Sequence, residues 1–315
     1  MGAPIPVAQP SGVGRPADLT PDDARWLAWH EACSHALLGR EVRDLGDAWL
    51  LHDPTDREPF WNRIAGIAWP AEPGAFDRRL TEMLALFAGL DRIPHIWPMP
   101  GFDTPSDLTA RLLANGFEDH GGGMLMALDA PRADATPHRA TAAEAAASDR
   151  PDRGGSPADR PDRGGSPTGV RIERLHLLTG DAAIAAARAI AAVLVASFAV
   201  EPERRVAIEL EAVQGLATEA YHAILVRVDG MPAAVARRTT FAGASYLSSI
   251  GTDPGFRGRG LGRLVTSAAV VDARAAGSRW TYLGVFEENA VARSLYESLG
   301  FVMIGGVAPD LLLRP

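Results

Sequence analysis

A short turn rich in glycine and arginine, set between a strand-like run and a helical run, constrains the fold of this chain more than any other segment. It follows the apolar run 244–252 and opens the helical run 261–276, and its residues are Arg257, Gly258, Arg259, Gly260, Leu261 and Gly262. Three glycines allow the backbone to approach a ligand without interference from Cβ atoms. The following helix directs unpaired N–H groups and the positive end of its dipole at an anion, and the arginines add charge for phosphate oxygens. The turn therefore predicts a diphosphate-binding site in an α/β domain.

Two other kinds of phosphate-binding loop are excluded by the same residues. A Walker loop requires a Gly-Lys-Ser/Thr sequence, and the 315 residues contain no lysine. A Rossmann fingerprint requires the spacing G-x-G-x-x-G, and the third glycine of this turn, Gly262, comes too early. The absence of lysine also excludes Schiff-base and lysine-nucleophile chemistry.

A second motif follows the turn, after the strand-like run 280–286. Its characteristic positions are Asn289, Ala292, Tyr296, Gly300 and Phe301. The order strand, Arg-x-x-Gly-x-Gly, helix, strand and then this motif resembles the acetyl-CoA site of the GNAT superfamily of N-acyltransferases. The resemblance covers residues 170–315 and implies an α/β GNAT fold, in which helices flank a mixed central sheet.

The resemblance also implies roles for the residues of both motifs. The end of the strand would lie along the pantetheine arm of acetyl-CoA, the turn would hold the diphosphate, and Asn289 would cap the second helix and contact the arm. The residues implied in binding acetyl-CoA are Ile250, Gly251, Thr252, Arg257, Gly258, Arg259, Gly260, Leu261, Gly262, Arg263, Asn289 and Ala292. Tyr296 would protonate the departing thiolate, because a phenol can donate to a sulfur whose basicity rises as the C–S bond breaks. The implied activity is an acetyl-CoA-dependent N-acetyltransferase, in which a small-molecule or peptide amine attacks the thioester directly in a ternary complex.

The chain lacks a general base at the position where some members of the resembled family carry one. Some family members carry a glutamate on the central strand, but the run 244–252 contains no carboxylate. Ser248 and Ser249 could order a water that passes the proton to a more distant acid. The candidate acids are Glu287 and Glu288 after the next strand and Glu209 and Glu211 in an acidic helix. The acidic residues that favour a cationic amine as acceptor are Glu201, Glu203, Glu209 and Glu211.

The low-complexity segment 132–169 divides the chain into two halves. It consists mainly of Ala, Pro, Asp, Arg, Gly and Ser, and the sequence Asp-Arg-Pro-Asp-Arg-Gly-Gly-Ser-Pro occurs in it twice. Such residues cannot bury enough apolar surface to offset the entropy of ordering, so a flexible linker is expected. Residues 1–17 are expected to form a flexible tail, 18–131 a first domain and 170–315 the catalytic domain.

The second half shows the element order of the resembled fold. Strands are predicted at 170–178, 221–229, 232–240, 244–252 and 280–286, helices at 181–198, 203–217 and 261–276, and a helical motif at 289–301. Two closing strands are expected after this last motif.

The first half shows a weaker form of the same order. Its helical runs are 76–90 and 105–114, and its strand-like runs are 93–97 and 124–128. It resembles a decayed copy of the second half, which implies tandem domains, although a coincidental α/β domain is the alternative. Residues 71–74 replace the glycine–arginine turn, and Leu112 stands in the place of Tyr296. This half is therefore not expected to bind acyl-CoA.

Composition limits the partners and the compartment. A formal charge of -8 and a pI near 5.5 argue against a nucleic-acid partner. The single cysteine, Cys33, excludes an intrachain disulfide and favours the cytoplasm. The apolar run 182–200 is interrupted by Arg188 and predicts a buried helix rather than a membrane span. The sequence His-Glu-x-x-x-His at His30 lacks the spacing of a zinc-binding helix, so no metal site is expected.

Two functions of other kinds remain open. A CoA-binding regulatory module would retain the turn but show little turnover, in keeping with the missing strand carboxylate. An interaction protein would use residues 18–131 to bind a partner. The chain is expected to be a monomer with pseudo-dimeric tandem domains or a homodimer.

Overall fold

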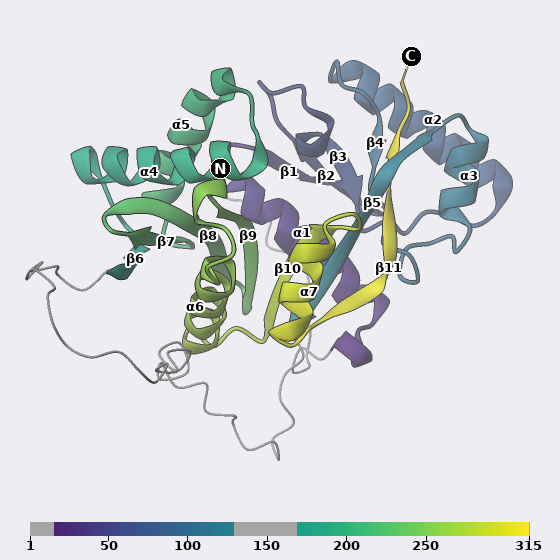
Figure 1. The fold of residues 1–315 in the computed structure, drawn as a ribbon. Coiled ribbons are helices and arrows are strands. Elements are labelled where there is room, and N and C mark those ends of the chain that lie inside the picture. The colour runs from purple at the N-terminus through teal and green to yellow at the C-terminus, as the bar shows by residue number, and fades with distance from the viewer. Residues whose placement is uncertain (1–15, 129–168, 315) are drawn as a thin grey trace, which may run out of the picture.

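The computed structural model describes residues 16–128 and 169–314, and these residues form one mixed sheet with helices on both faces (Figure 1). The eleven strands of the described residues lie in the order β1-β2-β3-β4-β11-β5-β10-β9-β8-β7-β6. Most of the predicted tail and of the predicted linker lie outside the described residues.

Each half contributes helices and strands to this sheet. The first half forms the helices α1 (Pro21–Ala36), α2 (Pro73–Gly89) and α3 (Leu108–Ala114) and the strands β1 (Glu41–Asp44), β2 (Trp49–His52), β3 (Arg63–Ala65), β4 (His95–Ile96) and β5 (Glu118–Leu128). The second half forms the helices α4 (Gly180–Phe198), α5 (Arg205–Leu216), α6 (Leu261–Ala275) and α7 (Ala290–Ser298) and the strands β6 (Val170–Leu175), β7 (Tyr221–Val228), β8 (Met231–Phe241), β9 (Ala244–Thr252), β10 (Trp280–Phe286) and β11 (Phe301–Leu312).

The predicted elements of the second half are confirmed, with one exception at its end. Strands β9 and β10 begin and end at the predicted residues. The prediction of two closing strands is wrong, because in the described part of the chain one strand, β11, follows α7. The position beside β10 is taken by β5 of the first half, which pairs antiparallel with both β10 and β11.

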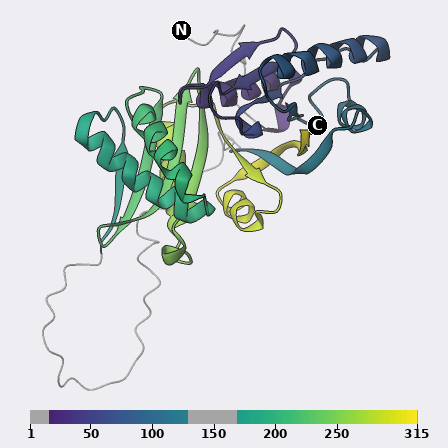
Figure 2. The ribbon, with the colours of Figure 1, turned by 90° about the horizontal axis from the view of Figure 1, so that it is seen from above.

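The last strands of the two halves are exchanged. Strand β5 pairs with β10, so that Tyr282 lies opposite Ala127, while β11 pairs with β4, so that Leu311 lies opposite Ile96. On either side of this exchange the arrangement repeats, since β3 is parallel to β4 as β9 is parallel to β10. The duplicated arrangement predicted from the sequence is therefore present, and each half completes the sheet of the other (Figures 1 and 2).

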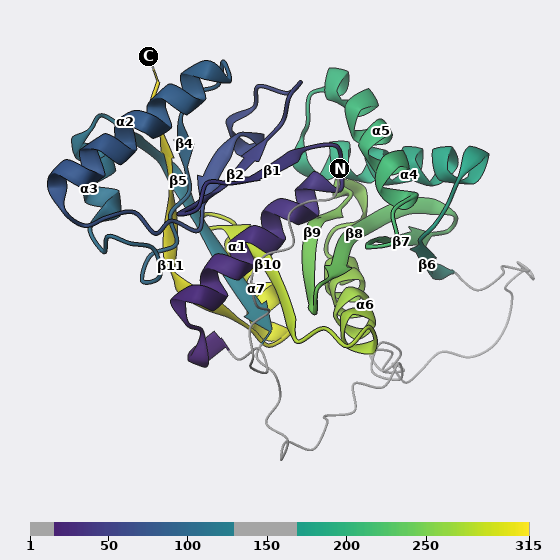
Figure 3. The ribbon, with the colours of Figure 1, turned by 180° about the vertical axis from the view of Figure 1, so that it is seen from behind.

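Alternate residues of the strands face two helical layers. Leu247 and Leu283 pack with Val265 of α6 on one face, whereas Tyr246 and Tyr282 pack with α1 on the other. Figure 3 shows α1, from the first half, crossing the strands of the second half. The packing of α1 on this face joins the halves in a common core.

A buried histidine of α1 also ties the two halves together. The ring of His30 is fully buried, with Nδ1 2.7 Å from the hydroxyl of Tyr282 and Nε2 3.1 Å from the carbonyl oxygen of Phe241. Burial lowers the pKa of His30 to about 3, so its ring is neutral and makes structural hydrogen bonds rather than binding a proton.

Helix α4 is the element that most resembles a membrane span. Among the described residues it is the one helix that is long and apolar enough to cross a bilayer. Its inner face, which includes Ile190 and Leu194, packs with Leu216 of α5 and Leu225 of β7. This packing agrees with the buried helix predicted from the sequence.

Candidate functional site

Strands β9 and β10 separate at one end. They are paired from Ala244 and Trp280 to Leu247 and Leu283, and no further pair joins them within the described residues. Ser249 has a φ of 49°, and the register of β9 against β8 shifts beside it, as in a β-bulge. The bulge turns the end of β9 away from β10 and leaves its backbone groups facing the opening.

The glycine turn leads from this opening into an open helix start. Gly258 and Gly260 have φ values of 75° and 72°, a conformation that favours glycine. Helix α6 begins at Leu261, and no side chain of the described residues caps it. If either glycine carried a Cβ, no heavy atom of the described residues would lie within 4 Å of it. The helix start is therefore accessible to an anion, as the sequence predicts.

A cleft of about 810 Å³ joins the strand end, the turn and α7. The predicted site residues that line this cleft are Ile250, Gly251, Thr252, Arg257, Gly258, Gly260, Leu261, Gly262, Arg263, Asn289, Ala292 and Tyr296. Arg259 is not among the residues lining the cleft, and its guanidinium lies 5.3 Å from the centre of the Phe256 ring. Ser197 and Phe198 at the end of α4 also line the cleft, although no motif in the sequence pointed to them.

Two of the predicted arginines connect the walls of the cleft. Arg257 donates a hydrogen bond of 2.9 Å from Nη2 to the carbonyl oxygen of Ser197, and Arg263 donates one of 2.5 Å to Oγ of Ser298. These bonds hold both guanidinium groups at the cleft while leaving other N–H groups available to phosphate oxygens.

Tyr296 lies on the cleft side of α7. Asn289 caps this helix by accepting a 3.1 Å hydrogen bond from the backbone N–H of Ala292, as predicted. The Tyr296 side chain is buried against Phe301, with ring centres 6.0 Å apart. Burial raises the pKa of Tyr296 to about 12, so the phenol keeps its proton at neutral pH and is suited to donate it.

The acids predicted to serve as base or to attract the amine do not line the cleft. Glu211 forms ion pairs with Arg237 and Arg40, with N–O distances of 2.7 and 3.3 Å. Burial alone would raise the pKa of Glu211, but these two arginines hold it below its ordinary value. The carboxylate of Glu211 is therefore committed to an interior ion pair, and the structure does not bring it to the cleft.

The other predicted acids also lie elsewhere. Glu209 pairs with Arg205 on the surface of α5, at 3.0 Å. Glu287 lies over β5, where a Cβ on Gly122 would be 3.0 Å from its Oε2. Glu287 is exposed and absent from the cleft lining, and the same holds for Glu201, Glu203 and Glu288.

Comparison with known protein sequences identifies a family for the second half. The model of the acetyltransferase (GNAT) family matches residues 189–301. A mycothiol acetyltransferase of Nocardiopsis dassonvillei is 48% identical over 54 residues, which are 17% of this chain and 16% of that protein. One from Beutenbergia cavernae is 49% identical over 55 residues, or 18% of each chain. The chain thus matches less than a fifth of the length of these curated relatives.

Solved structures resemble the chain over both halves. A GCN5-related N-acetyltransferase from Kribbella flavida has a TM-score of 0.59 at 20% identity, over 93% of this chain and 96% of that one. A tandem GNAT protein from the clavulanic acid biosynthesis pathway has a TM-score of 0.54 at 14% identity, over 94% and 98%. These likenesses establish the α/β GNAT fold and its tandem arrangement. Residues 189–301 of this chain form a domain that matches the acetyltransferase (GNAT) family model.

Proposed function

We propose that the protein is an acetyl-CoA-dependent N-acetyltransferase that transfers the acyl group to an amine by direct attack. The observation that carries the proposal is the single cleft in which the open start of α6, the separated end of β9 and the phenol of Tyr296 meet. A helix start binds a diphosphate, a free strand end binds an amide-bearing arm, and a buried phenol donates a proton. Acetyl-CoA carries the matching partner of each group in one molecule: a diphosphate, an arm with amide groups and a thioester sulfur that accepts a proton as it leaves.

The residues of the cleft fit this co-substrate. When bound, acetyl-CoA supplies the acyl group as a thioester. Backbone N–H groups at the start of α6 and the guanidinium of Arg263 would bind the diphosphate, and the open space over Gly260 leaves room for it. The backbone of Ile250 and Gly251 would orient the pantetheine arm, and an N–H there would stabilise the oxyanion that develops on the carbonyl.

Tyr296 would complete the transfer as a proton donor. As the amine nitrogen bonds to the carbonyl carbon and the C–S bond breaks, the phenol gives its proton to the departing sulfur. The nitrogen releases a proton to solvent or to a carboxylate outside the cleft lining, and the phenolate of Tyr296 takes up a proton from solvent, which returns the enzyme to its starting state. Because burial raises the pKa of Tyr296 to about 12, the phenol is still protonated at a pH near the pKa of the amine, about 10.

The test measures thiol release from acetyl-CoA with a panel of small amines and peptides. We expect the Tyr296→Phe variant to lower turnover by about 100-fold, while its affinity for CoA changes little, because the lost group acts on the leaving sulfur. We also expect wild-type turnover to rise with pH toward the pKa of the amine, about 10, without a decline from loss of the phenol proton.

A different outcome would favour the alternative function. If the protein binds CoA tightly, releases no thiol with any amine and is unaffected by Tyr296→Phe, it is a CoA-binding regulatory module. Equal turnover of the variant and the wild type would assign Tyr296 to packing alone.

A further inference from the structure

Among the described residues three arginines are buried, and two of them lie against a carboxylate. The buried arginines are Arg63, Arg237 and Arg238. Nη2 of Arg63 donates to Oε1 of Glu31 at 2.5 Å, and Nη1 of Arg237 donates to Oε1 of Glu211 at 2.7 Å. In both pairs the opposite charge offsets the cost of removing an ion from water.

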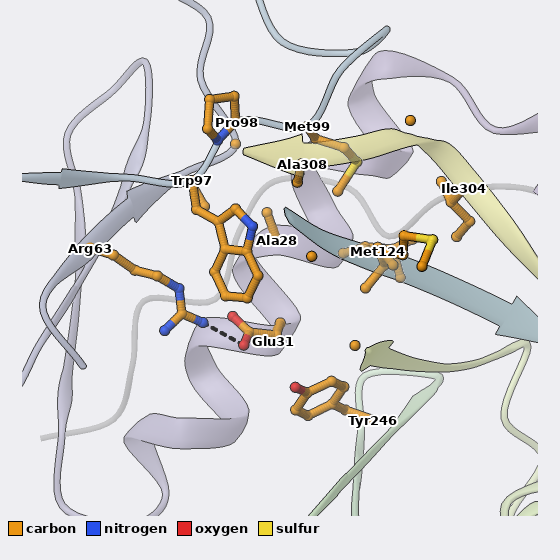
Figure 4. Close-up of a pocket in the computed structure, with 17 residues that line it drawn as sticks. Ala28, Glu31, Arg63, Trp97, Pro98, Met99, Met124, Tyr246, Ile304 and Ala308 are labelled. Atoms are coloured by element: carbon orange, nitrogen blue, oxygen red, sulfur yellow. Dashed lines mark hydrogen bonds and ion pairs between the residues drawn. The ribbon is translucent and has the colours of Figure 1, made fainter. Parts of the chain in front are cut away.

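The pair of Arg63 and Glu31 lines a second cavity, of about 80 Å³, whose walls come from both halves of the chain (Figure 4). The guanidinium of Arg63 also lies over the rings of Phe60 and Trp97, 4.3 and 4.8 Å from their centres. Burial opposes the charge of Glu31, but Arg63 and His35 hold its pKa at about 2, so the carboxylate is ionised at neutral pH. The two charged residues that line this cavity therefore balance each other.

Arg238 of β8 has no such partner. The residue is 5% exposed, yet none of the described carboxylates forms an ion pair with its guanidinium. Nη1 donates to Oγ1 of Thr240 at 2.5 Å, whereas Nε is buried and makes no hydrogen bond in the part of the chain that the structure describes. Burial lowers the pKa of Arg238, and Asp272 opposes that shift only in part. A guanidinium in this setting is a group that an anionic ligand would stabilise.

Arg238 lines a pocket of about 330 Å³ at the β6 edge of the sheet, which we call the edge pocket. Its walls come from β6, β7, β8 and the last turn of α6, and its polar lining residues are Arg174, His176, His222, Arg238 and Asp272. The cleft borders the first turn of the same helix. At a rise of about 1.5 Å per residue, the first and last turns of α6 are on the order of 15 Å apart, so the edge pocket is separate from the cleft.

The charges that line the edge pocket leave one positive charge unbalanced. Nε of Arg174 donates to Oδ2 of Asp272 at 2.7 Å, so these two charges offset each other. The charge of Arg238 is left over. His222 adds no charge at neutral pH, because burial, Arg238 and His176 lower its pKa to about 4 against the opposing effect of Asp272.

The two histidines of the edge pocket offer N–H donors. Their rings are stacked, with centres 4.0 Å apart. Nε2 of His176 lies 2.8 Å from the carbonyl oxygen of Glu219, so this nitrogen carries a proton and donates it there. The neutral ring of His222 also has one N–H group to donate. A surplus positive charge beside an N–H donor suits an oxyanion.

We propose that the edge pocket binds a phosphate group, either of inorganic phosphate or of a small phosphate monoester. Of the five N–H groups of Arg238, one is used by Thr240, and the others can donate to two phosphate oxygens as a fork. His222 would donate to a third oxygen, and Leu175 and Ala275 would contact the body of an ester. The proposal does not depend on acetyl transfer at the cleft.

The first experiment titrates inorganic phosphate and glycerol 3-phosphate into the Gly260→Asp variant by calorimetry, at constant ionic strength. The introduced carboxylate keeps phosphate away from the start of α6. We expect one phosphate site, and we expect the further substitution Arg238→Met to weaken binding at least tenfold, because a bidentate charge-assisted contact is lost. Arg205→Met removes an arginine of α5, 47% of whose side chain is exposed, and is the matched control.

The two ligands distinguish the sources of the phosphate group. Tighter binding of glycerol 3-phosphate would assign the edge pocket to an ester, and equal or tighter binding of inorganic phosphate would assign it to the free ion. The inference is overturned if neither ligand binds, if chloride binds with the same affinity, or if the two arginine variants lose affinity equally.

A second variant addresses the possibility that Arg238→Met weakens the fold. Asp272→Asn removes the one carboxylate among the described residues that line the edge pocket, and it leaves Arg238 in place. We expect phosphate affinity to rise at least threefold, because the repulsion between the carboxylate and the anion is lost. An unchanged or lower affinity would contradict an anion in this pocket.

Nuclear magnetic resonance of the His222 ring gives a local readout. A bound phosphate adds negative charge beside the ring, so the pKa of His222 should rise by about one unit or more when phosphate saturates the edge pocket. The pKa of His52, which burial lowers in the first half, should not change and serves as the control. An unchanged His222, or equal shifts of both histidines, would show that phosphate does not bind beside Arg238.

Discussion

Helices α2 and α6 occupy corresponding positions in the two halves, yet their first turns are used differently. Helix α6 follows Gly260, and no side chain of the described residues caps it. Helix α2 follows Glu72, whose carboxylate accepts hydrogen bonds from the backbone N–H groups of Gly74 at 3.0 Å and Ala75 at 2.7 Å. These bonds lower the pKa of Glu72. In the first half, the carboxylate of Glu72 thus occupies the start of the helix. In the second half, the corresponding helix start is left open to a ligand.

The residues after these helices also differ between the two halves. Tyr296 of α7 faces the cleft, whereas Leu112 of α3 is fully buried in the core of the first half. Both halves keep the parallel strand pair that precedes the site. The same scaffold therefore supports a candidate donor site in one half and core packing in the other.

Of the changes predicted from this difference, removal of the first half should have the largest effect, because it should abolish the stable fold of the second half. Without β5, strands β10 and β11 lose their shared neighbour, and without α1 the aromatic side chains Tyr246 and Tyr282 lose their cover. We expect residues 169–315 expressed alone to lack cooperative thermal unfolding, and co-expression with residues 1–128 to restore it. A stable, folded second half that binds CoA alone would show that the halves are independent, contrary to the exchange of strands.

The Gly260→Asp substitution should abolish CoA binding while leaving the fold intact. Its carboxylate would occupy the start of α6, as that of Glu72 does in α2, and would repel the diphosphate. Gly46→Asp is a matched control, because Gly46 has a φ of 84° and, within the described residues, open space at its Cβ position. Calorimetry should show lost CoA affinity in the first variant and unchanged affinity in the second. Equal CoA affinities of the two variants would show that the glycine turn does not bind CoA.

The Glu72→Ala substitution should have the smallest effect. It removes the side-chain cap of α2, so a decrease of a few degrees in the unfolding temperature is expected, with no change in CoA affinity at the cleft. Differential scanning calorimetry with and without CoA measures both quantities. Loss of CoA binding in this variant would instead show that the two helix starts are not separate sites.

The cleft could be predicted from the sequence because its residues are close together in the chain. The turn at 257–262 and the motif at 289–301 lie on consecutive elements, and glycine conformation, helix start and N-cap are local properties. The bounds of β9 and β10 were predictable for the same reason, as apolar runs ended by turn residues.

The strand exchange and the second cavity could not be predicted in this way. Nothing within 118–128 indicates whether that strand pairs with its own half or with the other, because pairing is decided by tertiary contacts. In the sequence Glu31 stands only within the excluded metal motif, while its partner Arg63 is distant in sequence, and the two meet in a cavity whose wall is formed by both halves. The arginine partners of Glu211 were hidden for the same reason.

The most direct test of the account is the stoichiometry of CoA binding to the whole chain, measured by isothermal titration calorimetry. One CoA per chain is expected, with binding lost in Gly260→Asp and retained in Gly46→Asp. Two CoA molecules per chain would contradict the difference between α6 and α2, and no binding would contradict the donor site and the transferase function that rests on it.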